Sequence, residues 1–486
     1  MKIFFIYLYV KIPQFPIGMG FISSMLKMVG HESRLFALES QQSPETLLSS
    51  IRMWSPDVIG FSSTSSMFER MKSVSSLIRQ QFKDIFQVCG GIHPTLVPEC
   101  IEEAPLNAIC RGEGEYAFVE LIERLSKGLD YTNIKGFWFK LNGNIIKNSM
   151  PLLIQDLNAL PMPDHDFYRS QDIPRKAKGV AEFMFSRGCP FDCSYCSNHA
   201  LKRLYPRQRY VRYPSVEKAI MELATVSKKY KIHYIMIHDD TFCLNKKWFY
   251  DFCQEYKDKI RIPFLCNIRP GTCTKDMFRL LREANCDAVG IGLESGNPFI
   301  REKVLNRKIK NGVILETFRL AHAMDINTLS FSMIGLPYET PEAIVDTIRF
   351  TAQLGDKNIP WKYIFHPYPN TTLFDHCQEK GWIGGKSPGF RERSRSALRL
   401  PTISRRDIHT YYNNFSMLIE VEKRAMIKNK LSIAKLLTKL FVFPKLLFLV
   451  KTYYCIYRIA RLLGSRKDCG TKCPQTQYQD KFSPFQ

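Results

Sequence analysis

Little in the 486-residue sequence would place it outside the cell or within a membrane. The apolar run in its opening MKIFFIYLYVK ends after eight residues without a small-residue cleavage site, which indicates a first buried strand rather than a signal peptide. Fifteen scattered cysteines are too few for a secreted disulfide scaffold. With 45% apolar residues the chain is not a disordered protein either, and we expect a core-forming, reduced, cytoplasmic protein.

Acidic residues are scarce in the last part of the chain. Residues 376–486 hold 22 Lys and Arg but only seven Asp and Glu, so most of the formal charge of +23 is local. A basic residue interrupts every apolar run of 431–464, which leaves it short of the roughly 20 apolar residues that a spanning helix needs. We interpret 376–486 as a basic, mainly helical extension. Two placements stay open for its segment 431–464: peripheral contact with the inner face of the membrane, or packing on the preceding domain.

Short β-branched or aromatic runs alternate with helix-length stretches from residue 1 to 135, which is typical of a doubly wound, Rossmann-like α/β domain. Ligands of such a sheet bind at the carboxyl ends of its strands. There the sequence places GFSSTSS (60–66), CGGIHPT (89–95) and CRGEGE (110–115), which are small, polar or glycine-rich. We expect these loops to form a cradle for a large flat ligand.

Residues 136–178 separate this domain from a second alternation of strands and helices. They comprise a hairpin that turns at Asn142-Gly143, where a type I′ turn needs positive φ, and a proline-punctuated linker. From 179 to 375, about six strand-like runs are separated by amphipathic helices, which predicts an open (β/α)6 partial barrel of the TIM type. Its functional face should be the carboxyl ends of the strands.

Three cysteines directly follow the first strand of that barrel, in SRGCPFDCSYCSN (186–198): Cys189, Cys193 and Cys196. Three thiolates can hold three irons of a cubane iron–sulfur cluster and leave the fourth iron open. Zinc is the alternative, but a structural zinc ion needs four closed ligands and no matching pair lies nearby. His199 could be offered as a fourth ligand, and we interpret it as incidental.

The C-x3-C-x2-C spacing, with the aromatic Tyr195 before the last cysteine, resembles the radical S-adenosylmethionine superfamily. The resemblance implies a [4Fe–4S] cluster on Cys189, Cys193 and Cys196, whose open iron chelates S-adenosylmethionine. It implies further that an electron from an external donor, of the flavodoxin or ferredoxin type, cleaves this molecule to methionine and a 5′-deoxyadenosyl radical. The radical then abstracts hydrogen from an unactivated carbon. The cofactor performs the difficult chemical step, and the protein orients the reacting groups and excludes water.

The same resemblance implies contacts to S-adenosylmethionine at the ends of the later strands. IHDDTF offers carboxylates to the methionine ammonium, although the Gly-Gly-Glu motif that the family usually has at this segment is absent. CNIRP offers partners for the carboxylate, GIGLESGN for the ribose and MIGLP for the adenine. The residues implied are Tyr195, Asp239, Asp240, Asn267, Arg269, Glu294, Ser295, Ile334 and Gly335. Strand-end capping or an ion pair is the alternative for each.

The N-terminal domain resembles the cobalamin-binding domain that some of these enzymes carry. PDVIGFS, CGGIHPT and CRGEGEYAFVELIERL carry this likeness, which extends over roughly 1–375. No Asp-x-His-x-x-Gly motif occurs, which implies that cobalamin would bind with its nucleotide tail displaced and no protein histidine on cobalt. The contacts implied are Ser62, Ser63, Thr64, Gly90, Gly91, His93, Gly112 and Glu113.

We therefore predict a cobalamin-dependent radical enzyme that methylates or otherwise remodels an unactivated carbon of a small metabolite, with a lipid or other hydrophobic substrate favoured by the basic, aromatic tail. A radical cyclase or oxidative tailoring enzyme is one alternative. A radical methylthiotransferase acting on RNA is another, and it would need a second cluster on Cys89, Cys100 and Cys110. An electron-transfer module would leave the glycine-rich loops unexplained. Nucleic acid is not an expected partner, and Cys469 and Cys473 either bind a metal or are simply exposed.

Overall fold

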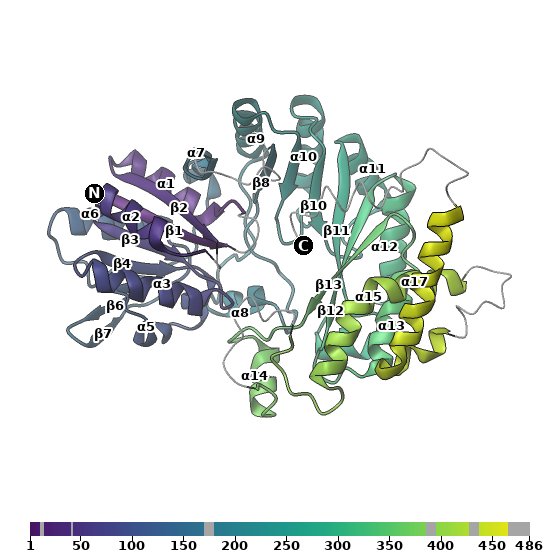
Figure 1. Cartoon of the computed structure of the whole chain (residues 1–486). Helices are drawn as coiled ribbons and strands as arrows, with labels where there is room; N and C mark the ends of the chain where they lie inside the picture. The colour runs from purple at the N-terminus through teal and green to yellow at the C-terminus, as the bar shows by residue number, and fades with distance from the viewer. Residues whose placement is uncertain (10–13, 40–41, 170–178, 385–394, 427–436, 465–486) are drawn as a thin grey trace.

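Two sheets organise the chain, one formed by its first 147 residues and the other by residues 180–364 (Figure 1). The computed structural model describes residues 1–9, 14–39, 42–169, 179–384, 395–426 and 437–464, with the backbone alone for 169 and 456–464. Cys469 and Cys473 lie outside the described residues.

The first sheet is doubly wound, as predicted. Its elements are β1 Lys2–Tyr9, α1 Ile17–Met28, β2 Glu32–Glu39, α2 Glu45–Trp54, β3 Val58–Ser62, α3 Phe68–Gln81, β4 Phe86–Gly90, α4 Ile92–Leu96, α5 Cys100–Glu103, β5 Ala108–Cys110, α6 Glu115–Ser126, β6 Phe137–Leu141 and β7 Asn144–Lys147. The strand order is β2-β1-β3-β4-β5-β6-β7, with β1 to β5 parallel. Helices α1 and α6 pack on one face, and α2 and α3 on the other.

Strand β1 shows why both faces are covered. Phe4 and Ile6 enter the core under α2 and α3, whereas Ile3 and Phe5 enter the core under α1 and α6. A parallel strand between two helical layers needs such a continuous apolar run.

The predicted hairpin turns where expected, with positive φ angles of 50° at Asn142 and 82° at Gly143. Its first strand, β6, pairs antiparallel with β5, so the hairpin is the edge of the first sheet. The sequence pattern placed this hairpin with the linker, because strand pairing across 26 residues leaves no local signal.

The second sheet is wholly parallel and open, in the order β13-β12-β11-β10-β9-β8. The elements are β8 Val180–Phe183, α8 Ser197–Arg203, α9 Val216–Tyr230, β9 Tyr234–Ile237, α10 Lys246–Lys259, β10 Phe264–Ile268, α11 Lys275–Glu283, β11 Cys286–Glu294, the π-helix η3 Ile300–Val304, α12 Asn311–Ala323, β12 Asn327–Ile334, α13 Pro341–Ala352, β13 Asn358–Ile364 and α14 Thr372–Glu379. The sheet and its helices form the six βα units of the predicted partial barrel. Side-chain caps start several of the helices, as Ser215 does for α9 and Thr340 for α13.

The described part of the basic extension packs on this barrel. It comprises α15 Arg405–Met426, the short 3-10 turns η5 Thr438–Val442 and η6 Pro444–Leu446, and α17 Leu447–Gly464. Tyr411, Phe415 and Leu418 of α15 are buried in one core with Ile344 and Ile348 of α13. Leu437, Phe441 and Leu447 of the segment 431–464 are buried in the same core, so packing on the preceding domain, one of the two placements left open, holds for this described part of the segment. Among the helices that the structure describes, none is both long and apolar enough to cross a membrane.

Candidate active site

The three cysteines lie in the loop between β8 and α8, and Cys196 is the residue before the first turn of α8. Hydrogen bonds from the segment around η3 fix this loop. The Ser194 amide donates to the Leu305 carbonyl at 3.1 Å, and its hydroxyl donates to the Val304 carbonyl at 2.7 Å. The side-chain amide of Asn306 donates to the Asp192 backbone carbonyl at 2.7 Å. The thiols therefore stand on a fixed loop at the carboxyl end of the first barrel strand.

Two guanidinium groups face the central cysteine. Nη1 of Arg269 lies 3.4 Å from Sγ of Cys193, and Nη1 of Arg307 lies 4.0 Å from the same sulfur. Arg269 also stacks on the Phe191 ring at 3.9 Å. The sequence pattern missed Arg307, because an arginine in the loop after η3 carries no signal until the chain folds it onto the cysteines.

This donor set fits a cubane cluster. Burial raises the pKa of the Cys189 thiol and raises that of Cys196 to about 12, so iron must displace their protons. In the part of the chain that the structure describes, no three His, Cys, Asp or Glu side chains converge as ligands of a single metal ion. A cubane places each thiolate on a different iron, and its ligands need not converge on one ion.

His199 is fully engaged elsewhere, as its interpretation as incidental requires. Its Nδ1 lies 2.7 Å from the Cys196 carbonyl and its Nε2 lies 2.9 Å from the Thr372 hydroxyl. The imidazole thus ties α8 to α14 and has no nitrogen left for a metal.

The two aspartates after β9 have different surroundings. Asp239 is fully buried and accepts hydrogen bonds from the Phe185 and Ser186 amides, both at 2.8 Å. Burial raises its pKa to about 6. Asp240 is exposed, and its carboxylate accepts a hydrogen bond from the Asn198 side-chain amide at 2.9 Å. Asp240 can therefore meet a ligand ammonium, whereas Asp239 holds the strand that leads to the cysteines.

Glu294 and Ser295, at the end of β11, point to different places. Glu294 adopts a φ of 66°, and its carboxyl lies with Tyr195 and Arg307, while burial raises its pKa. Ser295 is fully buried and its hydroxyl lies 3.3 Å from that of Thr347 on α13. Only Glu294 joins the group around the cysteine loop.

Glycines in β11 make room for these polar groups. A Cβ at Gly290 would lie 2.5 Å from Oδ1 of Asn267, and one at Gly292 would lie 2.4 Å from Oε1 of Glu294. The missing side chains leave space for Asn267 and Glu294 at the carboxyl end of the sheet.

The turn after β12 carries Ile334 and Gly335. The Ile334 side chain is buried in the core shared by α13 and α15, so only the backbone is free to face a ligand. Glu339, which the sequence pattern missed, is fully buried and accepts from the Gly335 amide at 2.6 Å and the Leu336 amide at 3.2 Å. Burial raises its pKa to about 8.

The loops after β3, β4 and β5 interlock into one rim. The Ser63 amide donates to the Gly90 carbonyl at 2.9 Å, and the Gly112 amide donates to the Thr95 hydroxyl at 2.9 Å. Ser62 and Thr64 are exposed there. Gly91 has a φ of 96°, and a Cβ on it would lie 2.8 Å from the Ser62 hydroxyl.

The rim faces the barrel. Helix α4 contacts α8, and Asn370 of the barrel donates to the Leu96 carbonyl of α4. Figure 1 shows α8 between the two sheets. The hydroxyl of Tyr205, just after α8, is buried without a hydrogen-bond partner among the described residues and would lie 2.0 Å from a Cβ at Gly112. A cradle of small residues with an orphaned polar atom fits a large polar-rimmed ligand such as cobalamin.

His93 and Glu113 do not point freely into this cradle. His93 is buried against the Phe68 ring, its Nδ1 lies 3.0 Å from the Ser65 hydroxyl, and burial lowers its pKa to about 4. Glu113 is bound by Arg187 and Arg212. Although burial opposes them, these guanidiniums hold its pKa below the usual range.

The thiols of Cys89, Cys100 and Cys110 do not form a second triplet. Cys89 and Cys100 are buried in the core on one face of the first sheet, and Cys110 in the core on the other face. Burial raises the pKa of Cys100 and of Cys110 to about 12. They are buried core side chains, which argues against the second cluster that a methylthiotransferase would need.

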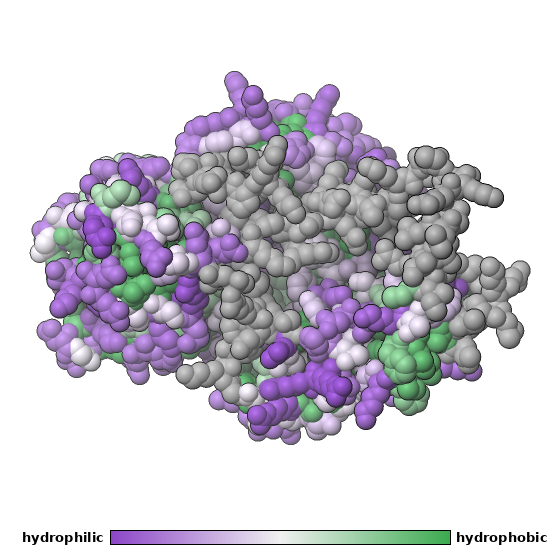
Figure 2. Space-filling view, viewed as in Figure 1, coloured by the Kyte–Doolittle hydropathy of each residue, from purple (hydrophilic) through white to green (hydrophobic). Residues whose placement is uncertain are grey.

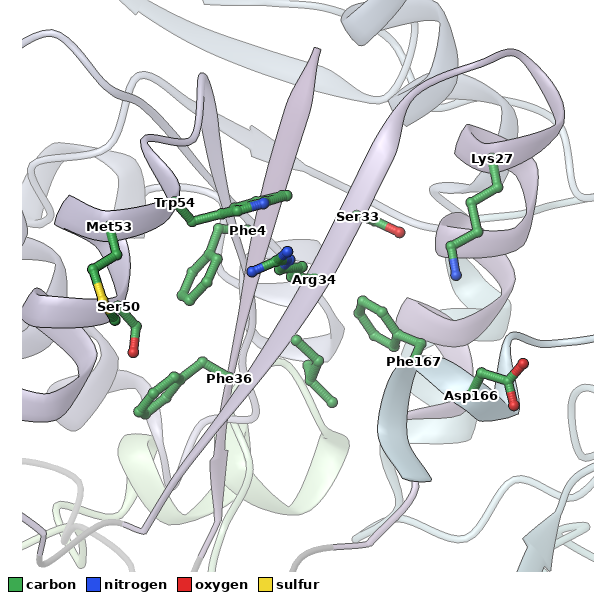
Figure 3. Close-up of a pocket in the computed structure, with 11 residues that line it drawn as sticks. Phe4, Lys27, Ser33, Arg34, Phe36, Ser50, Met53, Trp54, Asp166 and Phe167 are labelled. Carbon is green, nitrogen blue, oxygen red and sulfur yellow. The ribbon is translucent and has the colours of Figure 1, made fainter. Parts of the chain in front are cut away.

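A cavity of about 670 Å³ lies beside β2, at the outer edge of the first sheet (Figure 3). Phe4, Arg34 and Trp54 line it, with the Arg34 guanidinium over the Trp54 ring at 4.9 Å. The cysteines and the rim loops take no part in its described lining, so it is separate from the candidate active site.

Comparison with known families agrees with this geometry. Residues 183–351 match the radical SAM superfamily, and residues 7–122 match the B12 binding domain. An uncharacterised methyltransferase of Pyrococcus horikoshii is 31% identical over 370 residues, which cover 74% of this chain and 78% of the relative.

Two further proteins show the range of similarity. The anaerobic magnesium-protoporphyrin IX monomethyl ester cyclase of Rubrivivax gelatinosus is 24% identical over 379 residues, which cover 75% of this chain and 66% of the cyclase. The solved structure of OxsB, a cobalamin-dependent S-adenosylmethionine radical enzyme, superposes with a TM-score of 0.74 at 17% identity, covering 100% of this chain and 83% of OxsB. The shared fold therefore extends over both sheets.

Proposed function

The chain belongs to the radical S-adenosylmethionine superfamily and carries a B12-binding domain, and we propose that it methylates an unactivated carbon of a small hydrophobic metabolite. The observation that supports the proposal is the contact between α4, which follows the loop after β4, and α8, which follows the cysteine loop. When bound, the cluster, S-adenosylmethionine and cobalamin supply hydrogen abstraction and a methyl group. Reduction calls for an external one-electron donor, for which we propose a flavodoxin or ferredoxin.

The residues at the barrel mouth divide the work of holding these groups. Cys189, Cys193 and Cys196 would hold the cluster. Asp240 would accept hydrogen bonds from the methionine ammonium, because a carboxylate suits an ammonium electrostatically. Arg269 would bind the carboxylate, since a guanidinium can engage both of its oxygens.

The rest of the mouth would bind the nucleoside and the corrin. Glu294 would meet the ribose hydroxyls and the backbone at Gly335 the adenine. At the rim, Ser62 and Thr64 would present hydroxyls to the corrin edge, beside the small residues Gly90, Gly91 and Gly112. Holding these groups between the barrel and the rim would exclude water from a reactive radical.

The proposal is tested by anaerobic reconstitution, followed by iron and cobalt analysis and assay with methyl-deuterated S-adenosylmethionine. We expect about four irons per chain and bound cobalt, and a deuterated methyl group on a compound from a lipid or small-metabolite extract. Cys193→Ala should abolish the cluster, whereas Cys110→Ala, in the core of the first sheet, should keep it. Formation of 5′-deoxyadenosine with bound cobalamin but no deuterated product would favour the cyclase or tailoring alternative.

We propose further that the extension contacts an anionic lipid surface. Phe443 and Phe448 are 55% and 60% exposed, and Leu449 beside them is exposed as well, so these side chains form an apolar patch. Figure 2 shows a hydrophobic area at the lower right, on the side of the molecule where Figure 1 draws α17. Lys445 and Lys451 flank the patch, and 437–455 contains no acidic residue. Exposed apolar groups flanked by lysines fit the interface of an anionic bilayer. Contact with such a bilayer would bring a hydrophobic substrate to the enzyme.

A further inference from the structure

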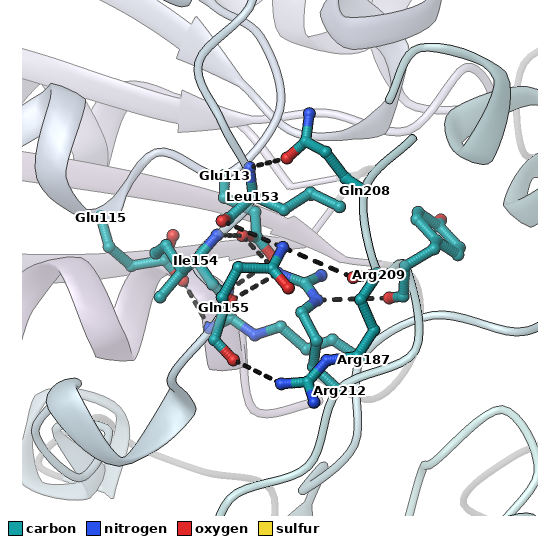
Figure 4. Close-up of polar contacts among 10 residues, drawn as sticks. Glu113, Glu115, Leu153, Ile154, Gln155, Arg187, Gln208, Arg209 and Arg212 are labelled. Carbon is teal, nitrogen blue, oxygen red and sulfur yellow. Dashed lines mark hydrogen bonds and ion pairs between the residues drawn. The ribbon is translucent and has the colours of Figure 1, made fainter. Parts of the chain in front are cut away.

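Four buried charged residues join the first domain to the barrel (Figure 4). Oε1 of Glu113 accepts from Nη1 of Arg187 at 3.0 Å, and its Oε2 accepts from Nη1 of Arg212 at 2.8 Å. Oε1 of Glu115 accepts from Nη2 of Arg187 at 2.6 Å. The glutamates belong to the loop after β5 and the first turn of α6, and the arginines belong to the barrel.

The network is closed and electrically balanced. The exposed fractions of the side chains are 14% for Glu113, 5% for Glu115, 12% for Arg187 and 2% for Arg212. Two carboxylates face two guanidiniums, and Glu115 also lies at the amino end of α6, where the helix dipole favours a negative charge. Removing one partner from such a set leaves a buried charge uncompensated, which costs more than the pair contributes by itself.

On the barrel side, the network acts directly on the cysteine loop. Arg187 stands two residues before Cys189, and its backbone exchanges hydrogen bonds of 2.9 and 3.0 Å with Arg212. Gly188, between Arg187 and Cys189, has a φ of 87°, and a Cβ on it would lie 2.5 Å from the Tyr210 carbonyl oxygen. The backbone from Arg187 to Cys189, which carries the first cluster thiol, is therefore closely constrained.

On the other side, the network fixes the candidate cobalamin rim. Glu113 follows Gly112 directly, and its Oε2 also accepts from the Ile154 amide of the linker at 2.8 Å. The linker is joined to the barrel again where Gln208 accepts from the Leu153 amide at 2.8 Å. Three hydrogen bonds from the chain itself thus engage both carboxylate oxygens of Glu113.

We propose that Glu113 and Glu115 are positioning residues which, through Arg187 and Arg212, set the distance between the cluster loop and the cobalamin rim. This assignment replaces the cofactor contact that the sequence predicts for Glu113. It rests on the two cofactor sites of the proposed function and is independent of the substrate.

The double variant Glu113→Gln/Glu115→Gln tests the proposal, because it keeps the side-chain volumes and removes the negative charges. In the reconstituted full-length enzyme, hydrogen–deuterium exchange should be about tenfold faster or more in peptides covering 186–198, with the core of the first sheet unchanged. Glu120→Gln is the matched control, because Glu120 pairs with Arg124 on the same helix without reaching the barrel. If the double variant does not fold, Glu115→Gln and Arg187→Lys are measured, and we expect smaller changes of the same kind.

A second measurement reads the spacing itself. With the cluster reduced and cobalamin as cob(II)alamin, the relaxation enhancement between the two spins should change at least twofold in the variants and stay at the wild-type value in Glu120→Gln. Exchange and relaxation equal to those of Glu120→Gln would overturn the proposal. So would a loss of cobalamin binding with unchanged exchange at 186–198, since Glu113 would then be a cofactor contact. Because neither readout uses a substrate, failure of the methyl-transfer assay would leave both outcomes interpretable.

Discussion

Nη1 of Arg269 lies 3.4 Å and Nη1 of Arg307 4.0 Å from the sulfur of Cys193, so two positive charges face one thiolate position of the cluster. Arg307 is almost wholly buried and also donates to the Gly292 carbonyl at 2.6 Å. A buried guanidinium stabilises negative charge on the sulfur more strongly than an exposed one.

Arg307→Gln should lower the reduction potential of the cluster, because the reduced cluster carries one more negative charge. We expect a fall of about 60 mV, which is a tenfold change in equilibrium constant for a one-electron couple. A redox titration followed by electron paramagnetic resonance, without S-adenosylmethionine, measures it. Arg282→Gln, at an exposed pair with Asp325, is the control, and an unchanged potential in Arg307→Gln would contradict the prediction.

Asp239→Asn and Asp240→Asn should separate stability from binding. Asp239→Asn turns an amide nitrogen toward a buried backbone amide, so we expect a loss of about 2 kcal/mol in the free energy of unfolding. Asp240→Asn should leave the stability unchanged and weaken S-adenosylmethionine binding about tenfold or more. Thermal unfolding and equilibrium binding measure the two effects. The assignment fails if Asp239→Asn weakens binding at unchanged stability.

Glu339 should make stability depend on pH. Its pKa is about 8 in the folded protein against 4.5 for an ordinary glutamate, so the folded state binds its proton more tightly than the unfolded state. The contribution is complete below pH about 4.5 and is lost as pH rises through about 8. In Glu339→Gln the decrease of Tm with rising pH should be smaller by a few degrees, since 1 kcal/mol in the free energy of unfolding corresponds to roughly 2–4 °C in large domains. The exposed Glu342→Gln serves as control, and it should retain the wild-type slope.

Phe443→Ser/Phe448→Ser should weaken binding to vesicles of phosphatidylglycerol and phosphatidylcholine. Two half-buried aromatic rings contribute enough apolar area for a loss of about tenfold. Sedimentation with vesicles measures it, and Phe299→Ser, at a residue that is 57% exposed elsewhere on the barrel, should bind as the wild type does. Equal binding by the double variant, or equal binding to neutral vesicles by the wild type, would argue against the anionic membrane as partner.

The sequence by itself determined the two βα repeats, the hairpin turn and the cysteine triplet. These features are local: continuous apolar runs mark strands covered on both faces, Asn142-Gly143 meets the φ demand of its turn, and three thiols share one loop. Family resemblance then pointed to the segments at the strand ends, because carboxyl ends of parallel strands meet at one edge.

Only the tertiary structure decided which side chains in those segments face the site. Asp239 and Asp240 are neighbours, yet one is buried under Phe185 and Ser186 and the other is exposed. The Ser295 side chain points toward α13. Arg307 contacts Cys193, which lies 114 residues earlier in the chain. Glu113 binds Arg187, which lies 74 residues later. Such contacts depend on how helices and sheets pack, and pairing over that separation leaves no pattern within a single sequence.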